Sequence, residues 1–314
     1  MFWLTWRRHR WLFLIGALLL FAFSAFFINN GLAIYHVYDT CHTNVALCVN
    51  KLYSSQIDLN HPPQIVQYLI VLPLLIGVFV GAPLLPGEQR TASFIRTQGV
   101  TLQRWLTIKL GLIILATLFF TVVLALVLAW WTPPIFALNV EFRWSYYEST
   151  GYVLIGKALF ALLLSITIGA LIRRTLPAMV VTFFLMIVLM IGLNAVYPHI
   201  LPPTSHLYPV SVALNGAGSE MPADSLLITS GPVDQNGQSI AWNNINTYCS
   251  LPSSDNVSNA SLVQCGKDKH LQWEVVYQPI EHYWPMQIIE SSVLLLLSLL
   301  LLPVIYWLSR RYLQ

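Results

Sequence analysis

The chain has 314 residues, of which 56% are hydrophobic and 9% are charged. Soluble globular proteins carry roughly 25% charged residues, so this composition excludes an ordinary soluble enzyme. It also excludes intrinsic disorder, which requires low hydrophobicity. A disulfide-rich miniprotein is excluded because four cysteines are sparse in a chain of this length. The composition therefore predicts a polytopic membrane protein.

The hydrophobic residues gather in long runs, and a helix needs about 20 apolar residues to cross a bilayer. No series of short alternating segments indicates a barrel instead. The six predicted membrane-spanning helices are residues 11–35, 65–85, 106–131, 151–172, 176–197 and 286–308. The first run could be a signal peptide, but it is longer than the roughly 7–15 residues typical of one, and no small-x-small cleavage site follows. We expect an all-α polytopic protein with six transmembrane helices.

The charges predict the orientation, because Lys and Arg near helix ends stay on the cytoplasmic side. With the N-terminus inside, the inner face holds 11 of the 16 basic residues, and Glu88 is its single acidic residue out of 13. The expected topology therefore places both the N-terminus and the C-terminus in the cytoplasm. The positive charge faces one side of a membrane and does not indicate nucleic-acid binding.

Four regions follow from this topology. The segment between the fifth and sixth helices is rich in Pro, Gly, Ser and Asn, with strand-like pieces at 225–229 and 271–277 bounded by turn residues. We expect it to form a small β-containing extracytoplasmic domain. The predicted regions are a cytoplasmic interfacial helix (1–10), helices one to five with short loops (11–197), the extracytoplasmic domain (198–285), and the sixth helix with a cytoplasmic tail (286–314).

All four cysteines lie on the outer side in this topology, where an oxidising compartment favours disulfides. Cys41 and Cys48 lie in the first outer loop, and Cys249 and Cys265 lie in the large outer segment. Four cysteines allow three pairings, and the spacing does not choose between them, although the two within-loop pairings close the shortest loops. Free thiols are the alternative.

An apparent phosphate-binding motif is explained better by chance. Gly151, Gly156 and Lys157 have the spacing of a P-loop, but Ala158 replaces the Ser or Thr that would bind magnesium, and no strand precedes the motif. We therefore expect no ATP hydrolysis by this chain.

Metal-capable side chains also occur just after the first predicted helix. His36, Asp39 and His42 are three residues apart, which brings them together only if the helix continues past Tyr35. They match no fixed metal motif, so we predict no metal site.

Ionisable residues are rare inside the predicted helices, where charge is costly and suggests a function, and two of them are candidates. Lys157 is about two turns into the fourth helix and Glu290 about one turn into the sixth, both from the outer side. They could form an intramembrane charge pair. The alternative is that each side chain extends separately to the outer interface.

Several stretches together resemble the permease subunits of bacterial ABC-2 type exporters. They are WLTWRRHR, GAPLLPGEQRTASFIRTQGVTLQRWLTIKLGL, GALIRRTLPAMVVT and VYQPIEHYWPMQIIE. One departure is that the family pattern has E-x-x-x-G-T in the second stretch, whereas Glu88 here is followed by Gln89, Arg90 and Thr91.

The resemblance implies a multi-pass subunit of the bacterial plasma membrane that exports a substrate the sequence does not identify. A separate cytoplasmic ABC ATPase would bind ATP and magnesium, so the chain itself would be no enzyme and would hold no cofactor. The expected partners are that ATPase, a second permease copy or a sister subunit, and membrane lipid. In such families the N-terminal helix and the loop between helices two and three receive the ATPase motion. The corresponding candidates are Trp6, Arg7, Arg8, Glu88, Arg90, Arg96 and Arg104.

Two other classes of function remain as alternatives. The first is a polytopic sensor or scaffold protein with an extracytoplasmic ligand-binding domain, which the composition does not exclude. The second is a membrane-embedded hydrolase, against which the absence of a polar catalytic cluster in the predicted helices counts.

Overall fold

The structure is a computed structural model, and it divides the chain into two compact units. Unit 1 comprises Met1–Ala195 and Gln287–Gln314, and unit 2 comprises Val196–Met286. Within them, the residues that the structure describes are 2–41, 61–86, 102–138, 142–210, 225–235, 237–241, 244–249 and 259–313.

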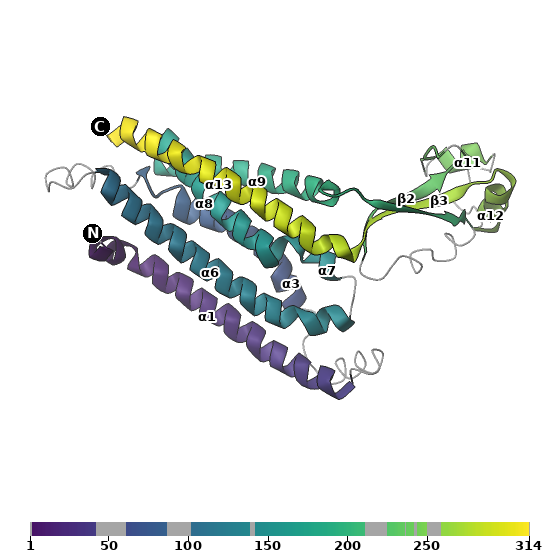
Figure 1. Cartoon of the computed structure of the whole chain (residues 1–314), viewed down its shortest axis with the longest axis horizontal. Helices are drawn as coiled ribbons and strands as arrows, with labels where there is room; N and C mark the ends of the chain where they lie inside the picture. The colour runs from purple at the N-terminus through teal and green to yellow at the C-terminus, as the bar shows by residue number, and fades with distance from the viewer. Residues whose placement is uncertain are drawn as a thin grey trace. The chain divides into compact units, whose positions relative to one another are not determined.

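Five helices are long and apolar enough to cross a membrane in the described part of the chain. They are α1 (Phe2–Cys41), α6 (Leu102–Leu138), α8 (Gly151–Ile172), α9 (Thr175–Val196) and α13 (Tyr283–Leu313), labelled in Figure 1. Each contains one of the predicted runs or coincides closely with it. The region 1–10, for which we predicted a separate interfacial helix, begins the same continuous helix as the first span.

The second predicted span is not a regular helix, so the count of six uninterrupted spans is not confirmed. It consists of α3 (His61–Tyr68), a 3-10 turn (Leu69–Val71), α4 (Leu72–Leu75) and a π-helical turn η2 (Ile76–Gly81). Pro73 lies in the first turn of α4 and has no N–H for the regular helical bond. The hydrogen-bond pattern therefore changes on both sides of it.

Helix α8 is the central element of unit 1. In its most apolar segment 72% of the residues are buried, against 17% in α9. Helix α6 and the broken second helix both pack against it. Gly77 and Gly81, four residues apart, face it, and a Cβ on Gly81 would meet Ser165 Oγ and approach the carbonyl oxygen of Leu162 to 2.8 Å. The two glycines thus permit a close helix contact.

Helix α1 packs along α6, as Figure 1 shows. The indole Nε1 of Trp131 donates a hydrogen bond to Asn30 Oδ1 at 3.0 Å, and the Tyr35 hydroxyl donates to the carbonyl of Trp130 at 2.9 Å. Phe27 is fully buried against the Trp131 ring. Aromatic packing with satisfied polar groups therefore fixes one end of this pair of helices.

Unit 2 contains a three-stranded antiparallel sheet in the order β1-β3-β2. The strands are β1 (Thr204–Pro209), β2 (Leu226–Val233) and β3 (Gln272–Gln278). The pieces predicted at 225–229 and 271–277 correspond to β2 and β3, whereas β1 was not predicted. Among the described residues, helices α11 (Ile245–Tyr248) and α12 (Asn259–Asp268) accompany the sheet. A mostly helical membrane fold with a small β-containing part is thereby confirmed.

Candidate functional site: a buried ion cluster

The segment that joins α6 to α8 is held by a glutamine of α13. Helix α7 (Phe142–Ser145) and the turn η4 (Tyr147–Ser149) lie in this segment. The fully buried Gln287 donates through Nε2 to the carbonyl of Tyr147 at 3.3 Å, and its Oε1 accepts the Tyr152 N–H at 3.3 Å. A single side chain thus fixes the backbone on both sides of the start of α8.

Gly151 makes this arrangement possible. Its φ of +65° lies in the left-handed region that favours glycine, and a Cβ at this position would meet Oε1 of Gln287. The Thr150 hydroxyl donates to the carbonyl of Tyr146 at 2.7 Å and closes the turn before the helix. The backbone around η4 is consequently well defined.

Glu148 projects from η4 toward Lys157 of α8, and Glu290 of α13 contacts the same lysine. The Lys157 Nζ lies 2.7 Å from Oε2 of Glu148 and 3.2 Å from Oε1 of Glu290. The three side chains are between 5% and 10% exposed. We call these three residues the ion cluster.

The close approach of α8 and α13 sets the position of the cluster. A Cβ on Gly156 would lie 3.2 Å from Cα of Ser291, so the two helices nearly touch beside Lys157 and Glu290. On the side of η4, the rings of Trp144 and Tyr147 stack with centroids 6.0 Å apart. Helix contact and aromatic packing together bury the cluster.

Burial has two electrostatic consequences here. A lone lysine or carboxylate at this position would be strongly disfavoured, so the lysine and the carboxylates require one another. Burial also raises the pKa of the Tyr146 phenol well above its ordinary value, so this hydroxyl stays protonated. The arrangement can bind and orient charge, and none of its described groups has the arrangement of an activated nucleophile.

The predicted residues Lys157 and Glu290 are therefore brought together, whereas Glu148 was missed in the sequence analysis. The acid lies in a short segment between two apolar runs, where sequence periodicity gives no direction. Its position shortly before a helix that contains a lysine was the available signal. Gly151, Gly156 and Lys157, which have the spacing of a P-loop, lie in the first turns of α8, and Lys157 is part of the ion cluster.

The predicted ATPase-coupling residues are placed only in part. Arg104 is exposed in the first turn of α6. Trp6, Arg7 and Arg8 belong to α1, but their side chains lie outside the description, as do the residues Glu88, Arg90 and Arg96 altogether. The structure does not bring these candidates together.

Lys109 marks the end of α6 that follows the predicted coupling segment. It is 2% exposed, and its Nζ donates to the carbonyl of Leu84 at 3.3 Å and lies 5.2 Å from the centroid of the Trp105 ring. Leu84 and Lys109 flank residues 87–101 in the chain. The two ends of that segment are thereby joined.

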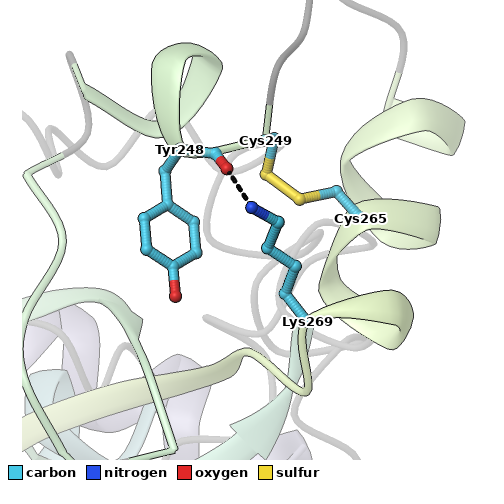
Figure 2. The surroundings of a disulfide bond; sticks show 4 residues. All are labelled: Tyr248, Cys249, Cys265 and Lys269. Carbon is cyan, nitrogen blue, oxygen red and sulfur yellow. Dashed lines mark hydrogen bonds between the residues drawn. A yellow bond between two sulfur atoms is a disulfide. The ribbon is translucent and has the colours of Figure 1, made fainter.

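Cys249 and Cys265 of unit 2 form a disulfide, drawn in Figure 2, with their Cα atoms 5.7 Å apart. Beside it, Lys269 Nζ donates to the carbonyl of Tyr248 at 2.6 Å. Cys41 is the last residue of α1, and Cys48 lies outside the described residues.

The helix condition for the histidine pattern is met, because α1 continues past Tyr35 to Cys41. Among the residues with described placement, no three His, Cys, Asp or Glu side chains gather as metal ligands. His42 lies outside that part.

Five long apolar helices in the described part of the chain, with a buried ion cluster at the most enclosed of them, define a multi-pass membrane protein. The profile of one protein family, described as ABC-2 membrane transporter related, matches residues 17–197. This match covers more than half of the chain, and it includes Glu148 and Lys157. The chain belongs to the ABC-2 membrane transporter-related family. No curated protein and no solved structure matches it.

Proposed function

We propose that the chain is the membrane-spanning permease subunit of an ABC-2 type exporter in a bacterial plasma membrane. The family match over residues 17–197 carries this proposal, and the packed apolar helices support it. The chain itself is not an enzyme. A separate cytoplasmic ABC ATPase binds ATP and magnesium and drives the movement of the substrate, and this chain pairs with a second copy or a sister subunit in contact with lipid.

In this proposal the inner face receives the ATPase. The N-terminal residues Trp6, Arg7 and Arg8 and the segment that contains Glu88, Arg90, Arg96 and Arg104 form the docking region. The bond between Lys109 and the Leu84 carbonyl supports this assignment, because it joins the two ends of that segment and passes its motion to both α6 and the broken second helix. Irregular helices with 3-10 and π-helical turns often accompany such functional hinges.

The test is copurification from native membranes. A chain with Glu88, Arg96 and Arg104 all changed to Ala is expected to lose a copurifying ATPase that the unaltered chain retains. The matched control changes Lys267 and Lys269 of unit 2 to Ala, which removes charge far along the chain from the docking region. Retention of the ATPase by the first variant would reject the coupling assignment.

The proposed topology has both termini in the cytoplasm and unit 2 outside the cell. The Cys249–Cys265 disulfide supports it, because disulfides persist in oxidising compartments. After mild reduction of intact cells, a thiol reagent that cannot cross lipid should label Cys249 and Cys265. Labelling of these two cysteines only after lysis would invert the topology.

A polytopic sensor with an extracytoplasmic ligand-binding domain is the second candidate. It is favoured by one observation, a groove of about 540 Å³ in unit 2 between β1 and α12, lined by residues that include Tyr208, Lys267 and His270. The copurification experiment separates the two, because a sensor of this kind requires no ATPase.

A further inference from the structure

The ion cluster does not balance its charges. Two carboxylates, Glu148 and Glu290, contact one ammonium group, that of Lys157. With all three groups ionised, the enclosed site would carry one uncompensated negative charge. Such a charge is strongly disfavoured where water is excluded, and it is normally neutralised by a proton or a bound cation.

Among the side chains that the structure describes, no other charged group supplies the missing positive charge. The described neighbours are Tyr147 of η4 and, from α13, Gln287 and Ser291, none of which is cationic. Lys109 and Arg104 belong to the first two turns of α6, at the opposite end of that helix from η4, and Arg310 and Arg311 end α13. Lys157 is the single cation in contact with the two carboxylates among the described side chains, which do not include that of Arg143 in α7.

Carboxylate oxygens of the cluster are also unused. Apart from the contacts with Lys157, Oε1 of Glu148 and Oε2 of Glu290 are buried and have no hydrogen-bond partner within the described part of the chain. The hydroxyl of the buried Ser291, next to Glu290 in sequence, is in the same situation. A buried carboxylate oxygen normally accepts hydrogen bonds or carries a proton, so these unused oxygens are sites where a proton would reside.

We propose that Glu148, Lys157 and Glu290 form a proton-binding site. One proton, taken from the aqueous phase, forms an O–H bond on the carboxylate pair when the cluster is closed, which makes the enclosed site neutral. When α8 and α13 separate and water enters, the O–H bond breaks and the proton returns to water. The site thereby links the opening of this end of the bundle to proton release, and it acts in the chain alone, independently of any ATPase partner.

The first test is infrared spectroscopy of the purified full-length chain in detergent at neutral pH. The unaltered protein is expected to show the C=O stretch of a buried protonated carboxyl group. Glu148→Gln and Glu290→Gln should each remove this band, because each leaves one carboxylate paired with Lys157 and no proton to hold. Lys157→Met should roughly double it. The control Glu281→Gln, at an exposed position in unit 2, should leave it unchanged.

The second test follows the unfolding temperature as a function of pH. The folded chain holds a proton that the unfolded chain releases, so the folded state loses stability as the pH rises. Glu148→Gln should remove this contribution to the pH dependence of the unfolding temperature. Either single glutamine variant suffices if the other fails to fold. The proposal is overturned if neither variant changes the carboxyl band or the pH dependence. It is also overturned if sodium or potassium ions, with no carboxyl band present, stabilise the unaltered chain but not Glu148→Gln.

Discussion

Glu148 lies 2.7 Å from the ammonium group of Lys157, although the two residues belong to different elements, the turn η4 and the helix α8. This contact holds the segment between α6 and α8 against α8, which is the most buried helix of unit 1. With Glu290 added from α13, three parts of the chain meet at one buried lysine. The stability of this region therefore depends on charge balance.

Removal of the lysine tests that balance. Lys157→Met removes the cation that one buried carboxylate needs, so that group must also take up a proton, and the variant is expected to lose about 3–5 kcal/mol of stability at neutral pH. The triple variant Glu148→Gln, Lys157→Met, Glu290→Gln contains no charge at the site and should recover most of the loss. Thermal unfolding in detergent measures both. A triple variant as unstable as Lys157→Met would show that charge balance is not the cause.

Gly77 and Gly81, through which the broken second helix contacts α8, provide a second prediction. Gly81→Leu would push the helix away from Ser165 and Leu162 of α8 and should cost about 1–3 kcal/mol or more. Gly192→Leu is the matched control, because nothing lies within 4 Å of a Cβ at Gly192 in α9. Equal unfolding temperatures for the two variants would argue against close packing at Gly81.

Alanine substitutions at two glycines with positive φ distinguish the cost of backbone strain from the cost of a steric clash. Gly151 has φ +65° and faces Gln287, whereas Gly237 has φ +75° and nothing within 4 Å of a Cβ. Gly237→Ala should cost only the left-handed strain of about 1–2 kcal/mol. Gly151→Ala should cost more, because it also displaces Gln287 from η4. Hydrogen exchange within each unit measures the two losses, and a larger loss for Gly237→Ala would contradict the role given to Gln287.

The disulfide of unit 2 provides a local prediction. Cys249 and Cys265 are 16 residues apart, and opening a loop of that size costs about 3 kcal/mol. Changing both to Ser should therefore reduce amide protection in β3 and α12 while leaving α8 unchanged. Unaltered protection in β3 would mean that the sheet is stable without the crosslink.

The sequence predicts the membrane helices well, because the length of an apolar run reflects the thickness of a bilayer. Residues 151–172 coincide with α8. The regular rise of a helix also allows Lys157 and Glu290 to be placed at a similar depth. The change to 3-10 and π-helical turns around Pro73 has no such signal in the sequence, since it depends on packing against α8.

The features missed in the sequence lie where tertiary contacts decide the conformation. Glu148 is oriented by the bonds that Gln287 makes, 139 residues later in the chain. Strand β1, with sequence TSHLYP, is a mostly exposed edge strand and has no alternation of apolar and polar residues. Neither feature has a periodic signal that sequence analysis could detect.

Native mass spectrometry of the complex extracted from its own membrane tests whether this chain is the permease of an ATP-driven exporter. We expect an assembly in which this chain, paired with a second permease subunit, carries two copies of an ABC ATPase. If the extracted chain is intact and folded but never carries an ATPase, the proposed permease function is contradicted.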